Sequence, residues 1–256
     1  MQTYDIIIVG AGCAGLAAGM YAGRMQLKTL IFGDPIVGGI ITTTDIVENY
    51  PGFKKITGLE LAEKLREHAL DYKDFVEIKN ERVEKVSGKG PCFKVSAGGL
   101  NYTAKTIIFA TGMKERHLNV PGEAKYFTRG IFTCALCDGP LWKGKNIAVV
   151  GGSDSAAKEA LLLTQWAKKV FIIYRGDKIH PEPVNFARIE QKIREGKIEI
   201  IYKTNILEFK GEKFLKTVLL DKAYKGKKEF PIDAVFLSIG AVPISEMAAA
   251  LKVKLN

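Results

Sequence analysis

A glycine-rich turn between a short apolar run and an alanine-rich segment restricts the fold of this chain more than any other feature. The apolar run 5–9 leads through Gly10, Gly12 and Gly15 into a helical pattern, and a second apolar run at 28–32 follows. In a βαβ unit these glycines permit a tight turn, let the backbone approach a pyrophosphate, and let helix and strand pack closely, with the helix N-terminus facing the anion. The stretch predicts a dinucleotide-binding unit, with a glycine turn that binds nothing as the alternative.

The same organisation returns about one domain length later. An apolar run at 146–150 leads into Gly151-Gly152-Ser153-Asp154-Ser155-Ala156, then into a helical pattern and a strand pattern at 170–174. Ser153 stands where the glycine that admits the pyrophosphate is expected, so a turn that no longer binds is the alternative here. The chain has 256 residues, of which 47% are hydrophobic, enough for buried cores in two domains. We therefore expect an α/β protein with two Rossmann-like, three-layer domains that bind two nucleotides.

Two cysteines at C-x-x-C spacing, Cys134 and Cys137, lie between the glycine turns and are followed directly by Asp138. Two such thiols can form a disulfide or hold a thiolate, and an adjacent carboxylate can move the proton that thiol–disulfide exchange requires. The same spacing begins many zinc sites, but Cys13 and Cys92 lie far apart and the three histidines lack ligand spacing. The nearby βαβ pattern favours a redox centre over a zinc site or a structural disulfide, and we expect no metal.

The formal net charge of +10 comes from basic residues that are scattered along the chain. Aromatic residues do not alternate with them, as they would in a surface that binds nucleic-acid strands, so we expect weak steering of acidic partners instead of nucleic-acid binding. No apolar run reaches the ~18 residues of a membrane span, and the N-terminus resembles a strand more than a signal peptide. We expect a cytoplasmic protein with no membrane partner.

Charged residues follow the second strand of each predicted unit, where the ribose of a dinucleotide is usually bound. Asp34 stands at this place in the first unit, although Pro35 beside it makes a plain turn nearly as good an interpretation. Arg175 stands there in the second unit, where an arginine can accommodate a 2′-phosphate, with a solvated arginine as the alternative.

The stretch 38–52 is polar and too irregular for a single element, and we interpret it as a functional or surface loop. The irregular segment at 113–121, which ends in Pro-Gly, is typical of a domain boundary. The other patterns predict an amphipathic helix at 58–72, a small antiparallel meander within 75–104, and buried strands that end in glycine at 106–112 and 234–240.

Five stretches of the chain, taken in order, resemble the low-molecular-weight thioredoxin reductase family. They are the turn 10–15, Gly38-Gly39 through Thr42-Thr43-Thr44 to 48–52, Ala110-Thr111-Gly112, the segment 134–138, and the turn 151–156. The resemblance implies a homodimeric, FAD-dependent disulfide oxidoreductase that passes electrons from NADPH through FAD and the cysteine pair to thioredoxin or a similar protein disulfide. It also implies that the second domain is inserted into the first. The implied domains are an FAD-binding domain at 1–113, an NAD(P)-binding domain at 114–241, and at 242–256 the truncated start of the return to the FAD domain.

The resemblance assigns a role to each residue of the central segment. Cys137 is implied to be the thiol next to the flavin, Cys134 the thiol that attacks the partner, and Asp138 the proton donor and acceptor. The chemistry agrees that one thiol must face the electron source and the other must face outward. The implied cofactor-binding residues are Gly10, Gly12, Ala14, Gly15, Asp34, Gly38, Gly39, Thr43, Asn49, Val83, Ala110, Thr111, Gly112, Gly151, Gly152, Ser153, Asp154, Ser155, Ala156, Arg175, Ile239 and Gly240.

The chain departs from the family pattern at three places. The basic cluster for the 2′-phosphate is reduced to Tyr174-Arg175-Gly176-Asp177, so NADH joins NADPH as a candidate donor. Ile40 replaces a polar residue that usually follows the two glycines, and the chain ends at about the start of the family's final return to the FAD domain. The alternatives are the same reductase with a donor other than a pyridine nucleotide, and a flavin-free nucleotide-binding relative without reductase activity.

Overall fold

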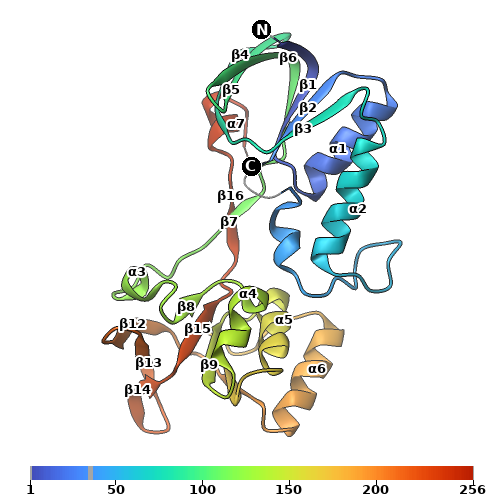
Figure 1. Cartoon of the computed structure of the whole chain (residues 1–256). Helices are drawn as coiled ribbons and strands as arrows, with labels where there is room; N and C mark the ends of the chain where they lie inside the picture. The colour runs from blue at the N-terminus through green and yellow to red at the C-terminus, as the bar shows by residue number, and fades with distance from the viewer. Residues whose placement is uncertain (1, 34–36, 256) are drawn as a thin grey trace. The chain divides into compact units, whose positions relative to one another are not determined.

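The computed structural model describes residues 2–33 and 37–255, and the chain divides into two compact units. Unit 1 comprises residues 1–114 and 243–256, and unit 2 comprises residues 115–242. Each unit has a sheet with parallel strands at its centre and helices packed against it (Figure 1), which is the α/β architecture predicted from the glycine turns. Within the described ranges, no helix is long and apolar enough to cross a membrane.

The sheet of unit 1 has six strands in the order β3-β2-β1-β6-β5-β4. The apolar run of β1 places this strand at the centre of the sheet. Its consecutive residues Ile7 and Ile8 point to opposite faces and are both fully buried. β1 pairs in parallel with β2 and β6, and β2 pairs in parallel with β3. These four strands are β1 (Gln2–Val9), β2 (Thr29–Phe32), β3 (Val76–Lys79) and β6 (Leu100–Phe109).

Two helices, α1 (Cys13–Arg24) and α2 (Gly58–Leu70), lie against the same face of this sheet (Figure 1). The predicted helix at 58–72 is confirmed as α2, which ends two residues earlier than expected. Its start is set by a capping box, in which the Thr57 hydroxyl accepts from the Glu60 amide and the Glu60 carboxylate accepts from the Thr57 amide. α2 therefore begins at a position that local hydrogen bonding fixes.

The antiparallel meander expected within 75–104 is only partly correct. β4 (Val83–Lys89), β5 (Cys92–Ala97) and β6 do pair antiparallel in sequence. β3, however, joins the parallel part of the sheet, because Val76 belongs to the apolar layer beneath α1 and α2. The other three strands form no separate sheet, since β6 also pairs with β1. The irregular stretch 38–52 contains one short 3₁₀ helix, η1 (Gly39–Thr43).

The main sheet of unit 2 has five strands in the order β11-β10-β9-β15-β8, and every neighbouring pair is parallel. This repeats the parallel pairing around the first glycine turn, as the repeated sequence pattern predicted. The strands are β8 (Ile131–Phe132), β9 (Asn146–Val150), β10 (Lys169–Ile173), β11 (Ile198–Ile201) and β15 (Ala234–Leu237).

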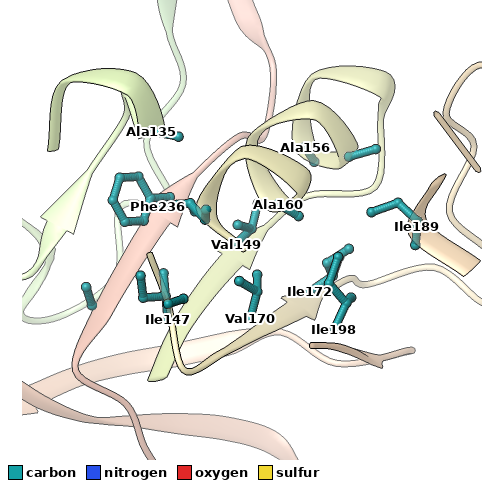
Figure 2. Packing of buried hydrophobic residues seen from close by; sticks show 14 of the residues in the cluster. Ala135, Ile147, Val149, Ala156, Ala160, Val170, Ile172, Ile189, Ile198 and Phe236 are labelled. Atoms are coloured by element: carbon teal, nitrogen blue, oxygen red, sulfur yellow. The ribbon is translucent and has the colours of Figure 1, made fainter. Parts of the chain in front are cut away.

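Small side chains let the helices of unit 2 approach this sheet. Ala156 and Ala160 of α5 (Asp154–Leu163) lie close to Val149 and Ile172 on the sheet (Figure 2). The same cluster contains Phe236, which is fully buried on β15, and side chains of α4 (Ala135–Asp138) and α6 (Pro183–Arg194). The cysteine segment is thereby attached to the core of unit 2.

The opposite face of this sheet is covered by a three-stranded antiparallel sheet. Two short strands, β7 (Met113–Glu115) and β16 (Ala241–Pro243), pair with each other where the chain passes between the units. The remaining elements are α3 (Glu123–Tyr126), η2 (Gly139–Trp142), β12 (Ile206–Gly211), β13 (Leu215–Tyr224), β14 (Lys227–Pro231) and α7 (Glu246–Ala250).

Replacement of Phe236 by alanine should destabilise unit 2 by about 3–5 kcal/mol, because it leaves a cavity among fully buried side chains that cannot all collapse into it. Denaturant unfolding followed by tryptophan fluorescence measures this directly, since both tryptophans, Trp142 and Trp166, belong to unit 2. Phe214→Ala is the control, because Phe214 is 46% exposed. Equal stability of the two variants would contradict the core assignment.

Candidate functional site

The first glycine turn joins β1 to α1 through two backbone contacts that exclude side chains. An added Cβ at Gly15 would lie 1.8 Å from the carbonyl oxygen of Gly10. Gly10 itself has φ +114°, and an added Cβ there would lie 2.1 Å from the carbonyl oxygen of Ala110, just after β6. The turn is therefore clamped between the ends of two parallel strands and the first turn of the helix.

Gly12, the middle glycine of this turn, faces more open space. An added Cβ at Gly12 would meet its nearest neighbour, the carbonyl oxygen of Gly38, at an ordinary 3.7 Å, so internal packing does not require glycine there. The first turn of α1 contains no acidic residue, and no side chain caps its amide groups. A helix N-terminus without a side-chain cap, beside a glycine that leaves room for a ligand, fits the pyrophosphate of a dinucleotide.

The loop that starts at Gly38 closes over this turn. The Gly38 amide donates to the Ala11 carbonyl oxygen at 2.7 Å, and an added Cβ at Gly39 would lie 3.1 Å from the Cα of Gly12. The structure thus gathers the predicted residues of the turn, the two glycines of the loop and Ala110 at one edge of the sheet. This is the carboxyl edge, where open parallel sheets bind their ligands.

Other predicted residues of unit 1 are placed less directly. The hydroxyls of Thr43 and Thr111 donate to the backbone carbonyls of Ile40 and Ile244. The Val83 side chain packs in the core and is only 4% exposed. Gly112 follows β6 with φ +70°, Ala14 is exposed in the first turn of α1, and Asn49 lies in the loop before Thr57, whereas Asp34 lies outside the described residues.

The second glycine turn repeats the clamp of the first. An added Cβ at Gly151 would lie 2.1 Å from the carbonyl oxygen of Ser238, just after β15. The side chain of Ser153, the N-cap residue of α5, makes no capping hydrogen bond and so does not occupy the amides of the first turn. Ala156 is buried beneath the turn, Ser155 is exposed, and Ile239 and Gly240 follow β15.

Asp154 introduces a carboxylate at this helix N-terminus, yet its charge is already engaged. Its oxygens accept from Lys158 Nζ at 2.8 Å, Asn185 Nδ2 at 2.8 Å and the Glu182 amide at 2.9 Å. Burial raises the pKa of the Asp154 carboxyl, but these hydrogen bonds outweigh it and hold the pKa below the usual range. Asp154 therefore ties α5 to the start of α6, and its charge is largely balanced by Lys158.

The two central cysteines form a disulfide with a Cα–Cα distance of 5.4 Å. Cys134 precedes α4, and its sulfur accepts a hydrogen bond from the Cys137 amide at 3.1 Å. Within unit 2 Cys137 is exposed and Cys134 is half-buried. Burial raises the pKa of the adjacent Asp138 carboxyl, so this acid holds its proton at higher pH than an ordinary aspartate. In the parts of the chain that the structure describes, no group of three or more His, Cys, Asp or Glu side chains could hold a metal ion.

A second acid of unit 2, Glu159, was not identified from the sequence. Glu159 lies on α5, and its Oε2 is buried without a hydrogen-bond partner among the described residues. Burial, and secondarily the charge of Glu115, raises the pKa of Glu159 to about 8. The sequence carries no signal of this, because a glutamate after Lys158 on an amphipathic helix resembles a solvated residue.

Tyr174 makes contacts that were not predicted from the sequence. Its ring packs against Gly152 and Gly176, and its hydroxyl reaches His180. Gly152 lies far from Tyr174 in the sequence, so only the folded chain brings all four residues together. Arg175, next to Tyr174, is exposed at the end of β10, where it was predicted to meet a nucleotide.

A family model described as pyridine nucleotide-disulphide oxidoreductase matches residues 4–256. The chain belongs to this family. Within it, the chain is 38% identical over 253 residues to the thioredoxin reductase of Bacillus subtilis (strain 168), an alignment that covers 96% of this chain and 77% of the relative. Its fold matches solved thioredoxin reductases of Lactococcus lactis and T. acidophilum, each with a TM-score of 0.90. These two are 34% and 32% identical and cover 97% and 100% of this chain, which in turn covers 81% and 83% of them.

The resemblance to the low-molecular-weight thioredoxin reductases is thereby confirmed, as is the expected two-domain α/β fold. The chain is an FAD-dependent disulfide oxidoreductase of the thioredoxin reductase family with a C-x-x-C disulfide. Binding of FAD and of NAD(P)H is a general property of this family.

Replacement of Glu159 by glutamine should make the stability of unit 2 less dependent on pH. The carboxyl binds its proton more tightly when folded, so the free energy of unfolding falls as the pH rises from about 4.5 towards about 8. The variant should match the parent at pH 5 and exceed it at pH 9 by on the order of 1–3 kcal/mol. Denaturant unfolding at both pH values measures this, with exposed Glu190→Gln as the control. A pH-independent difference between parent and variant would contradict the burial of this carboxyl.

Proposed function

We propose that this chain passes electrons from NADPH, with NADH as the second candidate, through FAD to the Cys134–Cys137 disulfide and on to thioredoxin or a similar protein disulfide. The observation that carries the proposal is this disulfide. Its segment packs on the core of unit 2, in the same cluster as Ala156 of the glycine turn. FAD held by unit 1 would supply the two-electron chemistry that links the nicotinamide to the disulfide. A cytoplasmic location suits this chemistry, since thiols are kept reduced there.

Unit 1 supplies the features that FAD requires. The uncapped N-terminus of α1 and the open face of Gly12 fit its pyrophosphate, and the loop of Gly38 and Gly39 lies directly beside them. Unit 2 repeats this arrangement with Gly151 and the N-terminus of α5, which fits the pyrophosphate of the pyridine nucleotide. The inserted domain is therefore assigned to the donor, and the domain that the chain enters first is assigned to FAD.

The two sulfurs have different roles in this proposal. Two electrons and two protons convert the disulfide into two thiols. The Cys134 thiolate then attacks the partner's disulfide, and Cys137 attacks Cys134 in the mixed disulfide, which releases the reduced partner and restores the Cys134–Cys137 bond. The amide of Cys137, which donates to the Cys134 sulfur, would stabilise a thiolate there. Asp138, the acid next to Cys137 whose pKa is raised by burial, supplies and removes the proton.

The surface next to the disulfide supports a protein partner. Leu141, four residues after Cys137, is 74% exposed, and Lys143 and Lys145 beyond it are exposed as well. An exposed apolar side chain beside basic ones suits a partner with an apolar contact and an acidic rim. A homodimer is part of the proposal, and Tyr21 on α1 and Met25 directly after it are exposed apolar residues that an interface would cover.

Serine variants of the two cysteines should differ in how they trap a partner. The probe is a thioredoxin with one active-site cysteine replaced by serine and the other activated with thionitrobenzoate. After reduction, Cys137→Ser should form a covalent complex with it at least about tenfold faster than Cys134→Ser, because Cys134 is the nucleophile. Non-reducing gels and released thionitrobenzoate report the rates, and Cys92→Ser, which removes an exposed free thiol, is the control. Equal trapping by both variants would contradict the assigned roles.

Replacement of Arg175 by alanine should remove most of the preference for NADPH. A charge-assisted hydrogen bond to the 2′-phosphate contributes about 1.5–3 kcal/mol, which corresponds to about a tenfold to hundredfold preference. The measurement is kcat/KM for both nucleotides, with exposed Arg194→Ala on α6 as the control. If the ratio for the two nucleotides is the same before and after the change, Arg175 does not read the phosphate.

A further inference from the structure

The ring of Tyr174 packs against two glycines, Gly152 and Gly176. An added Cβ at Gly152 would lie 2.5 Å from Cδ2 and Cε2 of the ring, and one at Gly176 would lie 2.5 Å from Cε1. Neither position can carry a side chain while the ring is in place. Gly152 belongs to the glycine turn and Gly176 to the loop after β10, so the ring joins the pyrophosphate turn to the loop that carries Arg175.

His180, at the far end of the same loop, is held to the glycine turn by two contacts. Its amide donates to the Gly152 carbonyl oxygen at 2.8 Å, and its Nδ1 shares a hydrogen bond with the Tyr174 hydroxyl at 3.3 Å. The two rings also lie 5.8 Å apart, centroid to centroid. His180 is nevertheless exposed, so one edge of the imidazole remains available.

We propose that Tyr174 is a positioning residue that presents the imidazole of His180 to the 2′ position of the nucleotide ribose. The inference rests on the proposed function, since it requires unit 2 to bind a pyridine nucleotide. In this arrangement the Tyr174 hydroxyl donates to Nδ1, which places the ring proton on Nε2. Nε2–H is then a hydrogen-bond donor, and both the 2′-hydroxyl of NADH and the 2′-phosphate of NADPH can accept from it.

The pair therefore provides affinity for both nucleotides, and discrimination is left to the charge of Arg175. Gly176 strengthens this division, because the ring of Tyr174 occupies the space that a basic side chain at position 176 would need. Asp177 and Lys178, which complete the loop, are both exposed and of opposite charge. The loop thus favours a site in which the charge of Arg175 selects the 2′-phosphate and His180 donates to either nucleotide.

Equilibrium titration of the full chain with NADPH and with NADH, followed by nucleotide fluorescence, tests the inference without turnover. Tyr174→Phe and His180→Ala should each weaken both nucleotides by about twofold to tenfold, the usual worth of one hydrogen bond. The double variant should bind no more weakly than His180→Ala, because Tyr174 acts only through His180. His180→Gln, which keeps an N–H donor near the same place, should retain most of the affinity.

Tyr126→Phe is the matched control, since it removes a hydroxyl of unit 2 that bonds to the Gly211 carbonyl, and it should leave both affinities unchanged. Thermal unfolding by tryptophan fluorescence shows whether Tyr174→Phe still folds. Unchanged affinities in a folded Tyr174→Phe, or losses that multiply in the double variant, would overturn the inference alone. Failure of the parent chain to bind either nucleotide would instead overturn the proposed function.

Discussion

Backbone contact without side chains, at the carboxyl ends of the central strands, is the constraint on which both units depend. Gly15 brings α1 within van der Waals contact of the Gly10 carbonyl, and Gly10 brings the turn against Ala110. Any Cβ at these places would force the helix away from the strands and open the sheet at its centre. The same approach creates the potential binding site, because it places the N-terminus of α1, which no side chain caps, at the carboxyl edge of the sheet.

Unit 2 uses this constraint with different chemistry around it. Its glycine turn is clamped by Gly151, but a carboxylate at the helix start would oppose an anion unless its charge were engaged. Lys158, Asn185 and the amide of Glu182 engage it, so the helix can keep Asp154 and still suit a pyrophosphate. The loop after β10 is then fastened to the turn by an aromatic ring instead of by further charges.

The redox centre draws on the same core. Ala135 of α4 packs in the cluster that holds α5 on the sheet, so the disulfide segment is attached to the core of unit 2 (Figure 2). Cys137 is exposed and Cys134 is half-buried, while burial raises the pKa of the Asp138 carboxyl. A packed support, an accessible disulfide and an acid with a raised pKa are together suited to thiol–disulfide exchange.

The sequence by itself determined the two βαβ units, the helix at 58–72, the redox pair and the family, because glycine spacing, hydrophobic period and C-x-x-C spacing are local properties. It placed β3 in a meander, since the short run 76–79 looks the same in either kind of sheet until Val76 meets the layer beneath α1. The charge state of Glu159 and the contact of Tyr174 with His180 were decided by tertiary structure alone. Burial and long-range contact have no sequence period, and desolvation depends on what the rest of the chain packs against a group.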